Sequence, residues 1–148
     1  MKVVLFQPQI PQNCGNIVRT CAVSGCGLVL VRPLGFSISN RWLKRAGLDY
    51  WLGVEVEVAD SLEAVLESSE GKAYFLSSKA SARYSDATYQ HNDLLIFGSE
   101  TAGLPPELHK TYAENFVTIP MRPGQRCLNL ATSVGIVVYE AWRQLGFQ

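Results

Sequence analysis

The chain has 148 residues, of which 47% are hydrophobic and 18% are charged. This composition excludes an intrinsically disordered or collagen-like protein and allows one domain with a packed core, over residues 1–148. The 13 Lys and Arg residues balance the 13 Asp and Glu residues, so the formal net charge is zero. Without an overall basic field, a nucleic-acid partner has to be bound by local clusters of positive charge.

Cysteine and histidine content argues against a structural metal. The four Cys residues form no C-x-x-C pair and there are only two His residues, so we predict neither a zinc site nor a disulfide framework. The first apolar run ends at Gln7 and Pro8, which is too short for a signal peptide or a membrane span. We therefore expect a protein of the reducing cytoplasm, with no membrane partner and no metal.

Short apolar runs alternate along the chain with segments of helical periodicity. Four of these runs are apolar at every position: 3–6, 28–31, 73–76 and 94–97. This pattern is typical of strands in a parallel sheet that is covered on both faces. Residues 54–58 alternate between Val and Glu, which predicts a strand with one wet face or a place near a sheet edge. A further short strand is expected at 116–119, ending at Pro120.

Helices are expected between these strands. The predicted segments are 13–24 with Gly25 at its end, a short one from Ser39 or Asn40 to Arg45, 61–68 after Asp60, one opened by Pro105-Pro106, and 129–145. Strands and helices that alternate through short connections predict an α/β fold, with a mostly parallel sheet and flanking helices.

The last predicted helix has two apolar strips. One strip contains Leu130, Ala131, Val134, Val137, Val138, Ala141 and Leu145, and the other contains Ile136, Tyr139 and Trp142. Because a surface helix normally has one apolar face, the second strip indicates packing against a second subunit in an isologous homodimer. The alternative is a helix wrapped by loops of its own chain.

Three polar, glycine-containing segments follow predicted strands, where α/β folds bind ligands. They are 11–19, 97–105 and 119–129. Without any site, the first segment would consist of an Asn helix cap, a turn glycine and a solvated Arg19. The second segment would then be a glycine-rich surface loop around Glu100. In the third, Asn129 can be a helix N-cap whether or not it also belongs to a site. Neither a phosphate-binding loop nor a G-x-S-x-G motif is present.

Together these segments resemble the SpoU branch of the SPOUT superfamily of methyltransferases. The shared patterns are N-x-G-x-x-x-R, G-x-E-x-x-G-L and I-P-M followed by L-N, and the resemblance covers essentially the whole chain. It is closest to the small tRNA wobble-position ribose 2′-O-methyltransferases, through residues 45–50 and 138–146. The resemblance implies a SPOUT-type fold with a C-terminal trefoil knot, and a homodimer with sites near the subunit interface.

The same resemblance implies a reaction and a cofactor. The expected activity is methylation of the ribose 2′-hydroxyl of the wobble nucleotide of tRNA, in leucine isoacceptors, with S-adenosylmethionine as methyl donor. The alternatives are another tRNA position, ribosomal RNA, or a non-catalytic homologue that binds RNA or cofactor. The implied catalytic residues are Arg19, Asn13, Glu100 and Asn129, and the implied cofactor residues are Leu76, Gly98, Ile119, Cys127 and Leu128.

The chemistry of three of these residues makes the expectation more specific. A guanidinium remains protonated, so we expect Arg19 to orient the 2′-hydroxyl and the neighbouring phosphate rather than to remove a proton. Cys127 stands where the family usually has Ser, which is harmless if only the backbone binds the cofactor. Glu100 is expected to orient Arg19 or Asn13.

RNA contacts are expected from local clusters and single residues. The candidates are Arg41, Lys44, Arg45, Lys79, Arg122, Arg126, Tyr139 and Arg143. A solvated helix face is the alternative for residues 41–45. Trp42 and Tyr50 can stack on a base or belong to the core.

Overall fold

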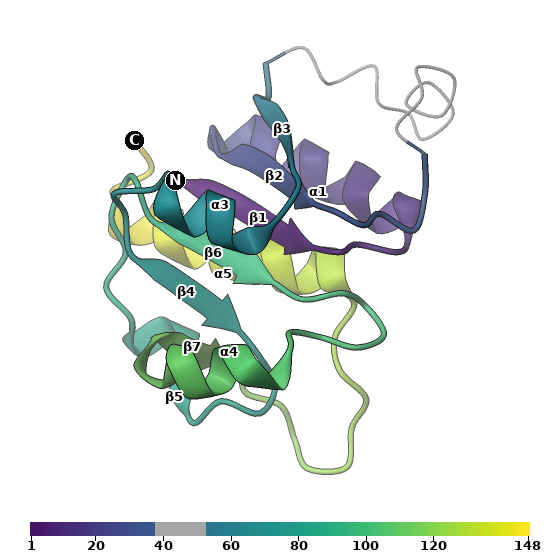
Figure 1. Cartoon of the computed structure of the whole chain (residues 1–148). Coiled ribbons are helices and arrows are strands. Elements are labelled where there is room, and N and C mark those ends of the chain that lie inside the picture. The colour runs from purple at the N-terminus through teal and green to yellow at the C-terminus, as the bar shows by residue number, and fades with distance from the viewer. Residues whose placement is uncertain (38–52) are drawn as a thin grey trace.

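The computed structural model describes residues 1–37 and 53–148, and its centre is a seven-stranded sheet (Figure 1). The strands are β1 (Lys2–Phe6), β2 (Gly27–Val31), β3 (Val56–Ala59), β4 (Ala73–Leu76), β5 (Ala82–Arg83), β6 (Leu94–Phe97) and β7 (Phe116–Thr118). Their order across the sheet is β3-β2-β1-β6-β4-β7-β5, and every pairing is parallel. The predicted α/β fold with a mostly parallel sheet is confirmed.

Helices connect the strands. They are α1 (Pro11–Ser24), α3 (Leu62–Glu67), α4 (Pro106–Thr111), α5 (Leu130–Gln144) and the short 3₁₀ helices η1 (Tyr84–Asp86) and η2 (Ala113–Asn115). The helix predicted to end at Arg45 lies outside the described residues. The sequence did not predict β5, η1 or η2, which are two or three residues long and contain no continuous apolar run. No helix in the described ranges is long and apolar enough to cross a membrane.

Side chains of the central strands alternate between two separate apolar cores. In β1, Val3 and Leu5 pack into the core that contains α1 and α5, whereas Val4 packs into the core beneath α3 and α4. The sheet is therefore the middle layer of three, with α1 and α5 on one face and α3 and α4 on the other (Figure 1). This arrangement explains why the central strands are apolar at every position.

The alternating Val-Glu segment forms the edge strand β3. This strand pairs only with β2 among the described strands, and Val58 on it is 38% exposed. The strand runs from Val56 to Ala59, displaced toward the C-terminus from the predicted 54–58. The predicted place near a sheet edge is confirmed.

The ends of α1 and α5 follow the expected local signals. Gly25 ends α1 with a left-handed φ of 71°, and its N–H donates to the carbonyl of Cys21. The helix begins at Pro11, earlier than the predicted 13, because proline suits the first turn of a helix. Asn129 is the N-cap of α5, as predicted, and its side chain accepts from the N–H groups of Ala131 and Thr132.

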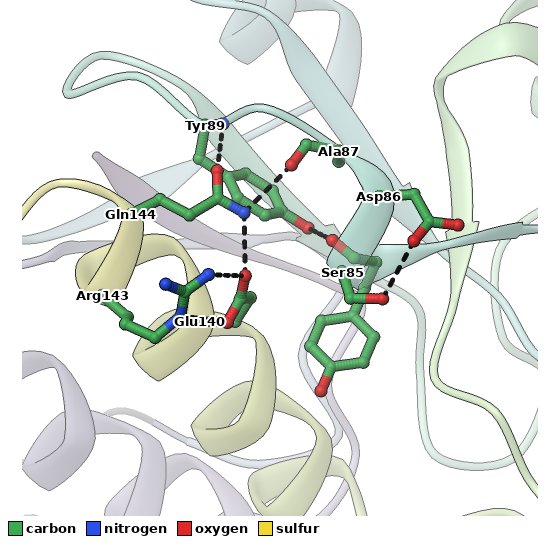
Figure 2. A network of polar contacts seen from close by, with 8 residues as sticks. Ser85, Asp86, Ala87, Tyr89, Glu140, Arg143 and Gln144 are labelled. Atoms are coloured by element: carbon green, nitrogen blue, oxygen red, sulfur yellow. Dashed lines mark hydrogen bonds and ion pairs between the residues drawn. The ribbon is translucent and has the colours of Figure 1, made fainter.

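A polar network ties the end of α5 to the segment before β6 (Figure 2). The side-chain amide of Gln144 accepts from the Tyr89 N–H at 3.1 Å and donates to the Ala87 carbonyl at 3.0 Å. It also donates to Glu140 at 2.9 Å, and Arg143 donates to both oxygens of Glu140 at 2.9 Å. The Gln144 side chain thereby satisfies the Tyr89 N–H and the Ala87 carbonyl, two backbone groups that have no strand partner.

Candidate functional site

The carboxyl ends of four strands meet at one edge of the sheet. Leu5 of β1 and Leu76 of β4 are both in register with Phe97 of β6, and Leu76 is in register with Val117 of β7. From the neighbouring strands β1 and β6 the chain continues to opposite faces, into α1 and α4 respectively. This is the switch point at which open α/β sheets bind ligands.

A cavity of about 570 Å³ opens at this edge. Its lining includes all five residues predicted to bind the cofactor, namely Leu76, Gly98, Ile119, Cys127 and Leu128. It also includes three of the four residues predicted to be catalytic, namely Asn13, Glu100 and Asn129. Segments far apart in the chain thus form one pocket, of a size typical for small-molecule sites.

Glu100 is held by hydrogen bonds from the segment that starts α1. Its carboxylate accepts from the backbone N–H groups of Gln9 at 2.8 Å and Ile10 at 3.0 Å, and from the side-chain amide of Asn13 at 2.9 Å. Burial by itself raises the pKa of Glu100, but hydrogen bonds from Asn13 and the backbone outweigh it, and the pKa is lowered. The ionised carboxylate lies at the N-terminus of α1, where the helix dipole favours negative charge.

Asn13 connects this carboxylate to α5. Asn13 is 5% exposed, and its side-chain oxygen accepts from the amide of Asn129 at 2.9 Å. Because the ionised Glu100 only accepts hydrogen bonds, Asn13 has to direct its nitrogen toward Glu100 and its oxygen toward Asn129. The chain Glu100–Asn13–Asn129 therefore links the three glycine-containing segments.

The ordinary capping alternative is wrong for Asn13 and correct for Asn129. The N-cap of α1 is Ile10, which has no side-chain cap bond, and Asn13 lies inside the helix with its side chain on Glu100. Asn129 combines both functions, since its oxygen caps α5 while its nitrogen bonds to Asn13. Glu100 contacts Asn13, one of its two predicted partners.

Gly98 is required by the closure of its own loop. Ser99 and Gly103 exchange backbone hydrogen bonds of 3.2 and 3.0 Å, which brings Gly103 against Gly98. A Cβ atom on Gly98 would lie 2.1 Å from the carbonyl carbon of Gly103, closer than any real contact. Only glycine at position 98 therefore lets the loop close on itself and form this part of the cavity wall.

Arg19 lies apart from the other predicted catalytic residues. It is exposed on α1 and is not among the residues that line the cavity. It lies in the second half of α1. Within one chain, the structure does not bring Arg19 to the Glu100–Asn13–Asn129 group.

The predicted RNA-binding residues fall into four groups. Lys79 lines the cavity, whereas Arg122 and Arg126 are exposed on the segment before α5 and do not line it. Tyr139 is 47% exposed on α5, and Arg143 forms an ion pair with Glu140. Arg41, Lys44 and Arg45 lie outside the described residues, as do Trp42 and Tyr50.

Several cavity residues were not predicted from the sequence. His109 of α4 lines the cavity and stacks on Phe116 with ring centroids 3.8 Å apart. Ser77 and Ser78 after β4, and Ser133 of α5, line it as well. Their position just after a strand was a usable signal for the two serines, but no local pattern marks His109. In residues 1–37 and 53–148, no group of three or more His, Cys, Asp or Glu side chains could hold a metal ion.

The family model described as SpoU rRNA Methylase family matches residues 1–139 of the chain. The chain belongs to the SpoU rRNA Methylase family. Among its SpoU relatives, a tRNA (cytidine(34)-2′-O)-methyltransferase of Methylovorus glucosotrophus is 46% identical over 147 residues. That match covers 98% of this chain and 96% of the relative.

Solved SpoU structures share the fold. One described as "Structural insights into the 2-OH methylation of C/U34 on tRNA" has a TM-score of 0.91 and 44% identity, covering 99% of this chain and 97% of that one. An AdoMet-bound rRNA methyltransferase from Sinorhizobium meliloti has a TM-score of 0.84 and 28% identity, covering 97% of this chain and 56% of that one.

Proposed function

We propose that this protein methylates the ribose 2′-hydroxyl of the nucleotide at wobble position 34 of tRNA, in the cytoplasm, with S-adenosylmethionine as donor. The observation that carries the proposal is the single cavity formed by all three family segments, joined by the Glu100–Asn13–Asn129 chain. The full-length similarity to tRNA (cytidine(34)-2′-O)-methyltransferases supports this substrate over ribosomal RNA.

The cavity fits the proposed donor. Leu76, Ile119 and Leu128 offer apolar side chains for a flat adenine, and the loop at Gly98 offers backbone groups beside it. Cys127 also lines the cavity, and its backbone can serve as the Ser backbone of the family pattern does. When bound, S-adenosylmethionine supplies a methyl group that is already activated by its sulfonium sulfur.

The polar chain positions the walls of the site. Alignment of the nucleophile with the methyl carbon can lower the barrier by roughly 7–11 kcal/mol at best, so fixed walls matter for the rate. Glu100 is a poor proton acceptor, since its lowered pKa and three hydrogen bonds keep it ionised and occupied. We assign Glu100 and Asn13 as positioning residues, and Asn129 as the residue that ties them to α5.

Arg19 joins the site in a homodimer. The outer side of α1 and α5 exposes large apolar side chains, with Val23 at 56%, Tyr139 at 47% and Phe147 at 56% exposure. The rings of Tyr139 and Phe147 pack edge-on against Trp142, with centroids 5.6 and 5.3 Å away. A second subunit covering these side chains lets Arg19, exposed on the same helix layer, orient the 2′-hydroxyl in a shared site.

The experiment is methylation of a leucine tRNA transcript, with the modified nucleotide located by mass spectrometry. We expect one methyl group at position 34, and none on a matched tRNA carrying 2′-deoxycytidine there, because the acceptor oxygen is missing. Methylation of the deoxy substrate would show base methylation instead. Methylation at another position or of ribosomal RNA alone would replace the proposed substrate.

A further inference from the structure

Lys79 follows β4 on a backbone held in place by hydrogen bonds. Ser77 donates its N–H to the Val117 carbonyl at 3.0 Å, and its hydroxyl accepts from the Lys79 N–H at 3.2 Å. The Ala80 N–H closes the turn on the Ser77 carbonyl at 3.3 Å. This anchored turn brings Lys79, an exposed residue, to the rim of the cavity, and Lys79 shares the lining with Leu76.

The described lining of the cavity contains one carboxylate, Glu100, and one lysine, Lys79. Glu100 is engaged by three hydrogen bonds, as described above. In the described ranges, ion pairs join Lys2 to Glu57, Arg32 to Asp60 and Arg143 to Glu140, and none includes Lys79. Lys79 therefore presents an ammonium group to whatever anion enters the pocket.

S-adenosylmethionine, the donor of the function proposed above on which this step rests, has one anionic group, the carboxylate of its methionine part. We propose that Lys79 binds this carboxylate and is a cofactor-binding residue, not the RNA contact that the sequence predicts. Lys79 shares its lining with all five predicted cofactor residues. Arg122 and Arg126, exposed and outside this lining, remain for the phosphates of RNA.

Two ligands that differ in the carboxylate test this assignment by calorimetry. S-adenosylhomocysteine contains the amino-acid part, whereas 5′-methylthioadenosine has the same nucleoside and a thioether but no carboxylate. For Lys79→Met we expect the affinity for S-adenosylhomocysteine to fall roughly tenfold, the scale of a lost hydrogen bond to a charged group. The affinity for 5′-methylthioadenosine should stay within about twofold of wild type, because neutral contacts persist.

Matched variants separate charge from general damage. Lys79→Arg keeps the positive charge and should recover most of the affinity for S-adenosylhomocysteine. Lys110→Met removes an exposed lysine of α4 that does not line the cavity, and should leave both affinities unchanged. Filter binding of tRNA without cofactor provides the second arm, in which Lys79→Met should bind tRNA as wild type does.

Equal loss for both ligands, or loss for neither, would overturn the assignment. Unchanged S-adenosylhomocysteine affinity together with weaker tRNA binding would identify a phosphate as the anion that Lys79 binds. Wild-type protein that binds neither ligand would instead contradict the proposed methyltransferase function, so the two failures are distinguishable.

Discussion

At the scale of single residues, the position of Glu100 decides what it can do. A free carboxylate in a pocket is a candidate base, but this one accepts from Gln9, Ile10 and Asn13 at 2.8 to 3.0 Å. Two of these donors are backbone N–H groups just before α1, whose own N-cap residue has no side-chain cap bond. We therefore propose that Glu100 acts through Asn13 and the start of α1, so that its removal should affect structure and rate together.

Glu100→Gln tests this positioning function. The amide NH₂ of glutamine would face a backbone N–H, so one donor loses its acceptor, and we expect a loss of about 1–3 kcal/mol in unfolding free energy. Urea denaturation measures the loss, and a methylation assay at a temperature where the variant is folded should show reduced turnover. Glu67→Gln, exposed at the end of α3, is the control and should be neutral. Wild-type stability and turnover in Glu100→Gln would contradict the assignment.

At the scale of elements, Asn129 joins a helix start to a site wall. Its oxygen caps α5 through Ala131 and Thr132, and its nitrogen bonds to Asn13. The two functions use different atoms of one side chain. A substitution that changes one atom can therefore separate helix capping from the placement of the cavity wall.

Asn129→Asp keeps the capping oxygen and loses the donor to Asn13. We expect the cap to persist, since a carboxylate is favourable at a helix N-terminus, while the buried Asn13 oxygen loses its donor at a cost of about 1–3 kcal/mol and the methylation rate falls by roughly tenfold or more. Asn129→Ala loses the cap as well and should cost about 0.5–2 kcal/mol more. Thermal unfolding and single-turnover methylation distinguish the variants. If the aspartate variant turned over normally, the Asn13–Asn129 bond would have no function in positioning.

The end of α5 contains a pH-dependent contribution to stability. Hydrogen bonds from Arg143 and then Gln144 lower the pKa of Glu140 to about 2 in the folded protein, from its ordinary 4.5. A depressed folded-state pKa stabilises the protein above the unfolded value, and this contribution is lost as pH falls from 4.5 through about 2.

Glu140→Gln should lose that dependence. In urea unfolding at pH 6 the variant should be less stable than wild type. The difference should shrink as the pH falls below 4.5, because the unfolded wild-type chain then takes up a proton at Glu140 while the folded chain keeps the charge down to about pH 2. A difference that stayed constant between pH 6 and pH 3 would mean that the Glu140 charge does not stabilise the fold.

At the scale of the whole molecule, the outer side of α1 and α5 exposes large apolar side chains, Val23 and Tyr139. Tyr139 and Trp142 belong to the second apolar strip of the sequence, and Tyr139 remains 47% exposed in one chain. The centre of the first strip, in contrast, is buried, with Val134, Val137, Val138 and Ala141 fully enclosed. Loops of the described chain do not cover Tyr139, which favours the homodimer over the wrapped-helix alternative.

Tyr139→Glu should shift the protein toward monomer. A charge in an apolar interface is costly to desolvate, so sedimentation velocity at micromolar concentration should show a smaller species with an intact far-ultraviolet spectrum. Val58→Glu adds the same charge at the exposed edge strand β3 and should sediment as wild type does. A wild-type monomer at that concentration would contradict the dimer and the shared-site function of Arg19.

Much of this architecture was present in the sequence by itself. Continuous apolar runs predicted the buried strands, Gly25 predicted the end of α1, and Asn129 predicted the start of α5, because burial and capping depend on near neighbours in the chain. The family patterns indicated residues that the structure brings to one cavity, and its lining contains all five cofactor candidates. Their binding of the cofactor stays a prediction.

Only the tertiary structure decided how distant residues interact. The sheet order places β1 beside β6, and this brings Glu100 to Gln9, Ile10 and Asn13, although about 90 residues separate them in the chain. Helical or strand periods repeat over a few residues and contain no information about such contacts. For the same reason, the hydrogen bonds from Gln9 and Ile10 to Glu100, the place of His109 in the cavity and the absence of Arg19 from the lining became visible only in the folded chain.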